Sequence, residues 1–182
     1  MHVPALYLDR KGALRVPPFD TTAGDGATLA DLSRKRMEWF LDTARRERGF
    51  PLKPNTAPEA LLKHLNLLDG RKPTNAAVLL FGSAPQRFHR TAEIKCVFSH
   101  GTAYRRPFAS QQIYSGDLFE QADQARDFVL AKINRAVGTR ATSITAPAIY
   151  ELPPDAVGEA IVNGSWNPFI NPTSEWGIWD LA

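Results

Sequence analysis

The sequence has one cysteine, Cys96, which excludes an internal disulfide and fits the reducing conditions of the cytosol. Its four histidines lack the spacing of metal ligands, so we predict no metal site. No apolar run approaches the ~20 residues that span a bilayer, and residues 1–10 lack the apolar stretch of a signal peptide. We therefore expect a cytoplasmic protein without a membrane partner.

Phosphate-binding loops are missing as well. No Walker A sequence, Gly-x-x-x-x-Gly-Lys-Ser/Thr, occurs in the chain, and no Asp-x-Gly-x-Gly nucleotide box follows Asn163. We therefore expect that the chain by itself holds no cofactor and hydrolyses no ATP.

Cys96 lies on the apolar side of an alternating stretch, which indicates a buried structural thiol rather than a reactive one.

What the sequence does contain is an uneven charge. Residues 1–106 hold 18 Lys and Arg against 10 Asp and Glu, a net of +8, whereas residues 107–182 hold 4 against 9, a net of −5. A basic half attracts polyanions such as nucleic acid, and the acidic half argues that only part of the surface does so. The alternative interpretation is an ordinary solvated surface whose charges are unevenly spread.

Two helices are expected in the first part of the chain. The first covers residues 28–48, with Thr28 as its cap and Gly49 as its end. The second begins with the capping box Thr56-Ala57-Pro58-Glu59 and continues to Gly70. Both place apolar residues three and four positions apart, so each helix has one face to bury.

Two strands are expected in the middle of the chain. Residues 76–81 form a short apolar run bounded by Gly82, which is typical of a buried strand. Residues 94–98 alternate in character, which is typical of a half-buried strand. The two segments are close enough in sequence to pair as a wide hairpin, and residues 111–114 are expected to form a short edge strand.

The longest helix is expected to begin at Ser115-Gly116-Asp117 and to continue to Val137, where Gly138 ends it, because apolar residues recur three and four positions apart. One more strand is expected within residues 141–152, and a last helix follows Pro153 and Pro154. Together these elements predict an α+β fold, with a small mixed or antiparallel sheet packed by the long helix and an N-terminal helical pair.

Two basic segments are candidates for contact with nucleic acid. One is the helix at 28–48, and the other is the loop at 101–112, where aromatic and basic residues interleave as they do in sites that stack bases. The candidate residues are Arg34, Lys35, Arg45, Arg46, Tyr104, Arg105 and Arg106. Acidic residues lie among the arginines of the helix, so a solvated helix with internal ion pairs is the alternative. Any binding to DNA or RNA is expected to be weak.

A third candidate site is the pair Glu159 and Asn163 in the last predicted helix. Four positions separate these residues, so they project from the same face of a helix. A carboxylate and an amide oxygen placed in this way can act as a base and as a ligand for a hard cation. The same spacing also occurs by chance in many helices.

Five segments together resemble a known bacterial family. They are residues 73–82, 85–88, 112–116, 119–134 and 159–163. The resemblance is to RecG-related ATP-dependent DNA helicases and transcriptional regulators, which carry an N-terminal Schlafen-type AlbA_2 nucleic-acid-binding domain and a C-terminal histidine-kinase-like (GHKL) ATPase domain. It covers roughly residues 15–163 and implies that this chain is the middle region of a longer protein.

The resemblance gives roles to the pair in the last helix. Glu159-x-x-x-Asn163 is similar to the N-box of GHKL ATPases, in which the asparagine helps to bind Mg-ATP and the glutamate polarises the attacking water. In this reading Glu159 is catalytic and Asn163 binds cofactor only in the full-length parent protein. The implied organisation is a lead-in or linker at 1–27, an α+β middle module at 28–152, and the start of a GHKL-like domain at 153–182.

The family pattern stops after Asn163, and the remaining residues are rich in tryptophan and other apolar side chains. Residues 164–182 are therefore either a native apolar arm or a frameshifted, truncated or vector-derived end. A native arm would dock on its own domain or on a neighbouring copy, and in the second case the chain would form homo-oligomers. The resemblance implies a connecting or regulatory module of an ATP-dependent, DNA-binding transcriptional regulator, without activity as a fragment. The alternative is a nucleic-acid-binding module that uses the helix at 28–48 and the loop at 101–112.

Overall fold

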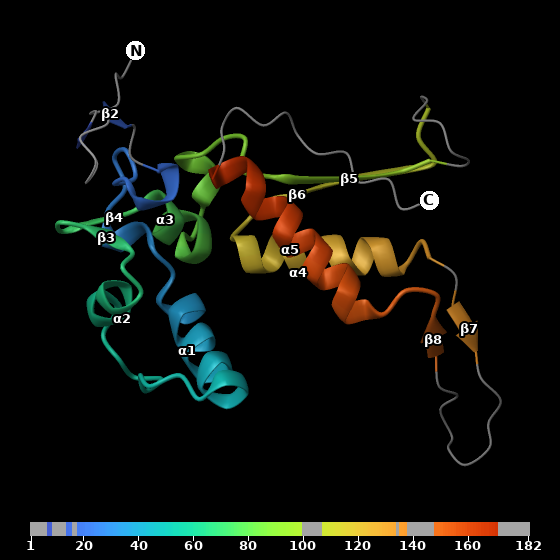
Figure 1. Cartoon of the computed structure of the whole chain (residues 1–182), viewed down its shortest axis with the longest axis horizontal. Coiled ribbons are helices and arrows are strands. Elements are labelled where there is room, and N and C mark those ends of the chain that lie inside the picture. Colours follow the sequence, from blue (N-terminus) through green and yellow to red (C-terminus); the bar gives the residue numbers. More distant parts are fainter. Residues whose placement is uncertain are drawn as a thin grey trace. The chain divides into compact units, whose positions relative to one another are not determined.

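In the computed structural model of the chain, the backbone is described for residues 7–8, 14–15, 18–99, 107–133, 135–137 and 148–170, and the side chains for 18–99, 107–133 and 150–164. The chain forms two units that meet in sequence between Ala92 and Glu93 (Figure 1). The sequence did not predict this division. Each unit combines helices with two-stranded antiparallel sheets, so the α+β fold class is confirmed.

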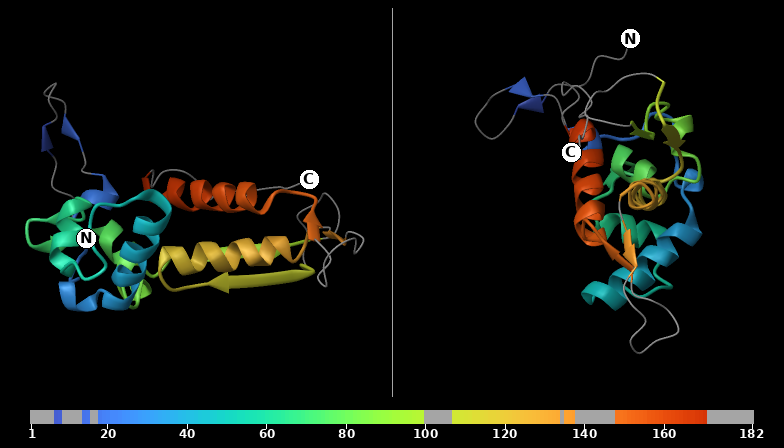
Figure 2. Two further views of the ribbon diagram at one scale, coloured as in Figure 1. Left: turned by 90° about the horizontal axis from the view of Figure 1, so that it is seen from below. Right: turned by 90° about the vertical axis from the view of Figure 1, so that its right-hand side faces the viewer.

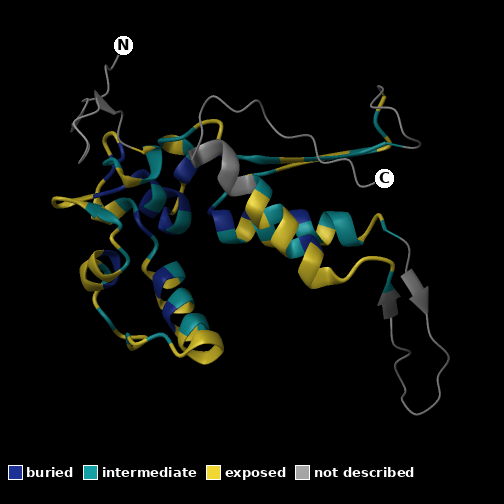
Figure 3. Ribbon diagram, in the orientation of Figure 1, coloured by how far each residue is buried: buried dark blue, intermediate teal, exposed yellow. Residues whose placement is uncertain are grey.

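Unit 1 is mainly helical, and its strands are two residues long. Its elements are β1 (Tyr7–Leu8), β2 (Leu14–Arg15), η1 (Phe19–Thr21), η2 (Leu29–Asp31), α1 (Arg34–Arg48), α2 (Pro58–His64), β3 (Leu68–Asp69), β4 (Lys72–Pro73), α3 (Asn75–Phe81) and η3 (Pro85–Arg87). Strand β1 pairs antiparallel with β2, and β3 with β4. Helix α1 contacts both α2 and α3, so the predicted helical pair is present. Buried residues collect on α3 and along one side of α1 (Figure 3).

The strand predicted at residues 76–81 is wrong, because this segment belongs to helix α3. The Thr74 hydroxyl caps the helix by accepting a hydrogen bond from the Ala77 amide at 3.3 Å. Five of the seven residues of α3 are buried. Apolar side chains therefore lie on every side of the helix, and periodicity cannot distinguish such a segment from a buried strand.

Asn75, the first residue of α3, joins the helix to the segment before α1. Its side-chain Nδ2 donates to the Phe19 carbonyl at 2.8 Å and to the Thr22 hydroxyl at 2.9 Å, 56 and 53 positions away in sequence. Its backbone amide donates to the Thr22 carbonyl at 2.8 Å. Because buried polar groups must be hydrogen-bonded, these distant partners help to fix where α3 begins.

A series of edge-to-face aromatic contacts connects helices α1, α2 and α3 of unit 1. The ring centroid of Phe81 in α3 lies 5.5 Å from that of Phe40 in α1, and Phe40 lies 5.7 Å from Phe50. Phe50 in turn lies 5.3 Å from His64, at the end of α2. Such pairs add roughly 0.5–1.5 kcal/mol each beyond the burial of their surface. Phe81 has no exposed surface, so it is the most enclosed ring of the series.

The helix predicted at 28–48 is interrupted after its first turn. Thr28 and Asp31 do form the predicted capping box, and the Thr28 hydroxyl donates to the Asp31 carboxylate at 2.7 Å, but the box closes η2 instead of α1. The hydrogen bonds from Thr28 hold the pKa of Asp31 below its ordinary value. After this turn the Ser33 amide donates to the Phe81 carbonyl at 2.6 Å, so pairing with the end of α3 splits the predicted helix.

Helix α1 then has its own caps. The Ser33 hydroxyl accepts a hydrogen bond from the Arg36 amide at 3.2 Å, which satisfies one of the free amides of the first turn. At the other end Gly49 adopts a φ of 63°, a left-handed conformation that glycine enters at little cost. The predicted end of this helix is therefore confirmed. The predicted start is wrong, because α1 begins at Arg34 and the residues before it form the separate turn η2.

Helix α2 is shorter than predicted and lacks the predicted capping box. Its cap residue is Ala57, which makes no side-chain hydrogen bond, and Pro58 occupies the first helical position. The helix ends at His64 instead of continuing to Gly70, because Asn66 has a φ of 56° and the chain turns into the β3–β4 hairpin.

His89 in unit 1 makes the stability of this unit depend on pH. Its ring lies edge-to-face with Phe19, with centroids 5.2 Å apart, and its buried Nε2 has no hydrogen-bond partner in the described part of the chain. Burial lowers the pKa of His89 below its ordinary value of 6.5. Below pH 6.5 the unfolded chain therefore binds a proton that the folded unit does not, so the free energy of unfolding falls until the pH reaches the lowered folded pKa.

We expect His89→Phe to abolish this loss, because phenylalanine keeps a ring next to Phe19 and does not titrate. The measurement is the urea midpoint of wild type and variant at pH 7.5 and 5.5. Wild type should lose more stability than His89→Phe between these two values, and the other histidines cancel because both proteins contain them. Equal losses in the two proteins would show that His89 is not the titrating group.

The described residues of unit 2 form two antiparallel strand pairs and two helices. Its elements are β5 (Ile94–Phe98), β6 (Ser110–Tyr114), α4 (Leu118–Leu130), β7 (Arg135–Val137), β8 (Ala148–Tyr150) and α5 (Pro154–Ile170). Strand β5 pairs with β6, with Ile94 opposite Tyr114 and Phe98 opposite Ser110. The strands predicted at 94–98 and 111–114 are confirmed. The hairpin predicted between 76–81 and 94–98 is wrong, because the earlier segment is helical and belongs to unit 1.

Helix α4 begins as predicted and ends early. Asp117 caps it by accepting a hydrogen bond from the Glu120 amide at 3.0 Å. The helix ends at Leu130 instead of Val137, because the chain enters strand β7, which pairs with β8. With 13 residues, α4 is also shorter than the 17 residues of α5, so the prediction that it is the longest helix is wrong.

Helix α4 lies between the β5–β6 hairpin and α5 (Figure 2). The residues buried in this arrangement include Leu118 and Ala125 of α4 and Val157 of α5. The predicted packing of a long helix on a small sheet is therefore confirmed for β5 and β6. In the described residues, no helix has both the length and the apolar character needed to cross a membrane.

Candidate nucleic-acid interface

Helix α1 carries the basic face that the sequence predicted. Six of its 15 residues are Lys or Arg and three are Asp or Glu. The last turn contains Arg45, Arg46 and Arg48, where positive charge is favourable because the helix dipole is negative at its C-terminal end. The buried residues of α1 are Met37 and Leu41, so the charged residues occupy the remaining, outward part of the helix.

Ion pairs within the helix neutralise two of the four predicted cations. Arg34 Nε lies 3.0 Å from Glu38, and Arg46 Nε lies 2.8 Å from Glu47, with side chains that are more than half exposed. The hydrogen bond to Glu47 raises the pKa of Arg46. Lys35 and Arg45, in contrast, form no ion pair with any described residue. Exposed pairs of this kind stabilise the helix little, so a phosphate group can replace the carboxylate partner of Arg34 or Arg46.

The charge of the chain divides along the boundary between the units. Residues 1–92 contain 15 Lys and Arg and 9 Asp and Glu, a net of +6, and residues 93–182 contain 7 and 10, a net of −3. The basic excess therefore belongs to the unit that contains α1. The other three predicted nucleic-acid residues, Tyr104, Arg105 and Arg106, lie outside the described residues.

Glu159 and Asn163 lie one turn apart on α5, as predicted. Both residues are exposed, and neither side chain makes a hydrogen bond or an ion pair with another described residue. Among the described residues, no group of three His, Cys, Asp or Glu side chains could hold a metal ion. The pair alone therefore does not fit Mg-ATP, which needs further oxygen ligands and a phosphate-binding loop.

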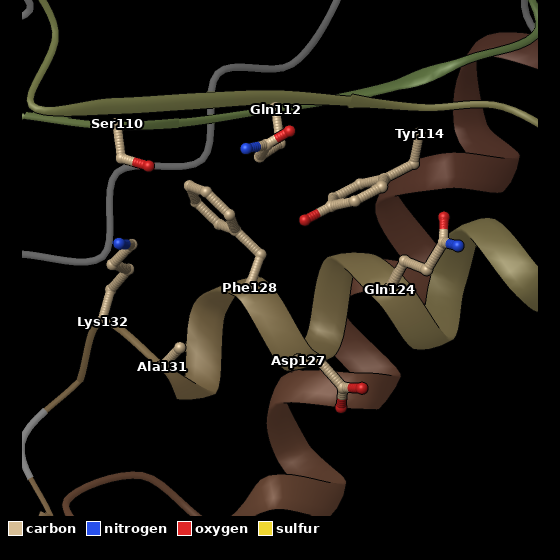
Figure 4. A pocket seen from close by; sticks show the side chains of 8 residues that line it. All are labelled: Ser110, Gln112, Tyr114, Gln124, Asp127, Phe128, Ala131 and Lys132. Atoms are coloured by element: carbon tan, nitrogen blue, oxygen red, sulfur yellow. The ribbon is translucent and has the colours of Figure 1, made fainter.

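A shallow depression of about 430 Å³ lies between β6 and α4 (Figure 4). The Phe128 side chain rises from α4 toward β6, and the Tyr114 hydroxyl points from β6 toward the helix (Figure 4). Lys132 Nζ lies 5.4 Å from the ring centroid of Phe128 and 5.8 Å from that of Phe98, as in cation–π contacts. Burial raises the pKa of Tyr114, and the negative charge of Asp127 adds to this shift.

The sequence did not single out this depression. The sequence pattern could have indicated it. Ser110, Gln112 and Tyr114 are two positions apart and therefore lie on one side of a strand, and the lining residues from α4 recur at helical spacing. Its lining contains one Lys and one Asp and no paired acid, base or nucleophile. It belongs to the acidic unit, so it offers little attraction to a polyanion.

Comparisons with known proteins identify no family. No family model and no curated protein match the chain. Among solved structures, the DIP2311 protein from Corynebacterium diphtheriae is similar, with 22% identity and a TM-score of 0.47 over 86% of this chain and 33% of that one. The chain thus spans about a third of that protein's length. The function proposed below does not rest on this similarity.

Proposed function

We propose that the chain is a connecting module of a larger DNA-binding transcriptional regulator of the cytoplasm, and that unit 1 itself binds nucleic acid through the phosphate backbone. The observation that carries this proposal is the excess of positive charge in unit 1, with Lys35, Arg45 and Arg48 of α1 unpaired in the described part of the chain. Such cations displace the counterions of a nucleic acid, and this gain does not depend on sequence.

The proposal includes the larger protein that the resemblance implies. In that protein, ATP hydrolysis would require residues outside the described ranges to complete a site around Glu159 and Asn163, since this pair alone does not fit the nucleotide. Unit 2 supports a connecting role, because α4 packs against both α5 and the β5–β6 hairpin, and the described depression beside α4 pairs no acid with a base. The apolar residues after Asn163 lie beyond the described side chains, and self-association through them is part of the proposal.

The binding of unit 1 should be weak, independent of sequence and sensitive to salt. Few cations are available, so we expect a dissociation constant of roughly 10⁻⁴ to 10⁻⁶ M at physiological salt. The logarithm of the affinity should fall by about 0.9 per phosphate contact for each tenfold rise in salt on duplex DNA. Fluorescence anisotropy with labelled oligonucleotides over a salt series measures both quantities. Tight binding that selects a sequence and survives high salt would contradict the proposal.

Variants locate the site of binding. The triple change of Lys35, Arg45 and Arg48 to Gln should flatten the salt dependence by about one unit of slope for each phosphate that the variant no longer neutralises. The matched control is Lys132→Gln, which removes one cation from the acidic unit and should leave the affinity within about twofold. Replacement of Arg105 and Arg106 by Ala tests the predicted loop, and a further loss of affinity would show that this loop takes part.

A further inference from the structure

We propose that Trp39 forms, with Arg36 and Lys35, a stacking platform on α1 that makes unit 1 prefer single-stranded nucleic acid to duplex. This inference rests on the proposed function, because it names the class of nucleic acid that the basic face takes. The sequence did not single out Trp39, since its position within a charged helix gave no signal apart from its residue type.

The exposure of Trp39 is the first observation. Its neighbours in α1, Met37 and Leu41, are 2% and 1% exposed, whereas Trp39 is 41% exposed. The guanidinium carbon of Arg36 lies 4.9 Å from the centroid of the Trp39 ring, the arrangement of a cation–π contact. This contact orients the indole on the helix surface, and a ring oriented in advance loses less entropy when a flat ligand stacks on it.

The charges around the indole are the second observation. Residues three and four positions apart are neighbours on a helix surface, so Lys35 and Arg36 flank Trp39 one turn before it, and Asp42 lies one turn after it. The carboxylate of Asp42 is 3.7 Å from Arg46, which reduces its repulsion of a phosphate. The indole therefore lies inside a basic surface, and charge complementarity favours a polyanion as its occupant.

Stacking on this indole distinguishes the two forms of nucleic acid. In a duplex the bases stack on one another and present only their edges in the grooves. A single strand can turn a base outward and place its flat face on an aromatic ring, while Lys and Arg hold the backbone on either side. Lys35 and Arg45 hold phosphates in both cases, and Trp39 adds an interaction that only the single strand can make.

The experiment compares labelled 20-nucleotide single strands and their duplex by fluorescence anisotropy at matched salt, using the full chain. We expect wild type to bind the single strand about fivefold or more tightly than the duplex, and Trp39→Leu to lose about five- to tenfold for the single strand alone. Trp39→Phe keeps a ring and should retain part of the preference. Single-strand binding should also quench tryptophan fluorescence in wild type, and less in Trp39→Phe. The control is Ile113→Ala, which removes another exposed apolar side chain, 53% exposed, from unit 2.

The outcomes separate this inference from the proposed function. Equal, salt-dependent binding of both forms that Trp39→Leu leaves unchanged would overturn the platform and keep the phosphate contact. Absence of salt-dependent binding to either form would overturn both. If Trp39→Leu changes the sedimentation of the free chain and not its binding, the indole belongs to a contact between proteins, and the inference is wrong. Thermal melting of each variant shows whether it is folded, and Trp39→Phe still tests the platform if Trp39→Leu is unstable.

Discussion

Replacing Phe81 by alanine is expected to lower the free energy of unfolding of unit 1 by about 3–5 kcal/mol. Phe81 has no exposed surface and meets Phe40 edge-to-face with 5.5 Å between ring centroids. Its removal leaves a cavity at the point where α3 meets α1, and Phe40 loses an aromatic neighbour. A loss of this size is a large part of the roughly 5–15 kcal/mol that stabilises most domains, so unit 1 should unfold at a clearly lower urea concentration.

Urea unfolding followed by circular dichroism measures the effect, and hydrogen exchange of the α1 and α3 amides shows that it arises in unit 1. Phe81→Leu keeps most of the volume and should cost less than about 1.5 kcal/mol. Leu29→Ala is the surface control, because Leu29 is 38% exposed and should change stability little. If Phe81→Ala unfolds at the same urea concentration as Leu29→Ala, the aromatic series is not the core of this unit.

The second large effect is expected from Ala125→Asp in α4, which should cost several kcal/mol and disrupt unit 2. Ala125 is 1% exposed, in a helix that packs against β5 and β6 on one side and α5 on another. A carboxylate at this position is removed from water, and the added atoms also strain a filled site.

Two comparisons separate the effect of charge from that of size. Ala125→Asn adds similar volume without a charge, so it should be less destabilising than Ala125→Asp at pH 7. The difference should shrink as the pH falls, because a buried Asp binds a proton more readily than one in the unfolded chain. Ala160→Asp on the exposed face of α5 is the control and should change stability by about 0.5 kcal/mol or less. A melting temperature of Ala125→Asp within one or two degrees of wild type would show that this face of α4 is not packed.

Several local features of this protein were determined by the sequence alone. Gly49 ends α1 because glycine enters the left-handed conformation easily, and Asp117 begins α4 because its carboxylate can accept a hydrogen bond from the first turn. Strand β5 followed from the alternation at residues 94–98. The charge asymmetry was also readable, and so was the basic character of α1. The two helix ends and the strand depend on residues that are close together in sequence, and the charges follow from residue type alone.

The tertiary structure decided whether some segments are helix or strand, where helices end and which strands pair. Residues 76–81 are apolar on all sides, so their helical form depends on the Thr74 cap and on partners of Asn75 more than 50 positions away. Helix α4 ends early because residues 135–137 form strand β7, which pairs with β8. Strand β5 pairs with β6 instead of an earlier segment, because the segment predicted as its partner is a buried helix of the other unit.

The features of the candidate nucleic-acid interface can also be divided into those that the sequence predicted and those that depend on the tertiary structure. The sequence supplied Lys35 and Arg45 as cations and the spacing of Glu159 and Asn163, because residue type and helical period are local properties. It indicated internal ion pairs on α1, and the structure shows them at Arg34 and Arg46. It did not supply the exposure of Trp39 or the placing of Arg36 on its ring. These depend on which side of α1 packs against α2 and α3, and that choice is made by the burial of Met37, Leu41 and Phe81 together.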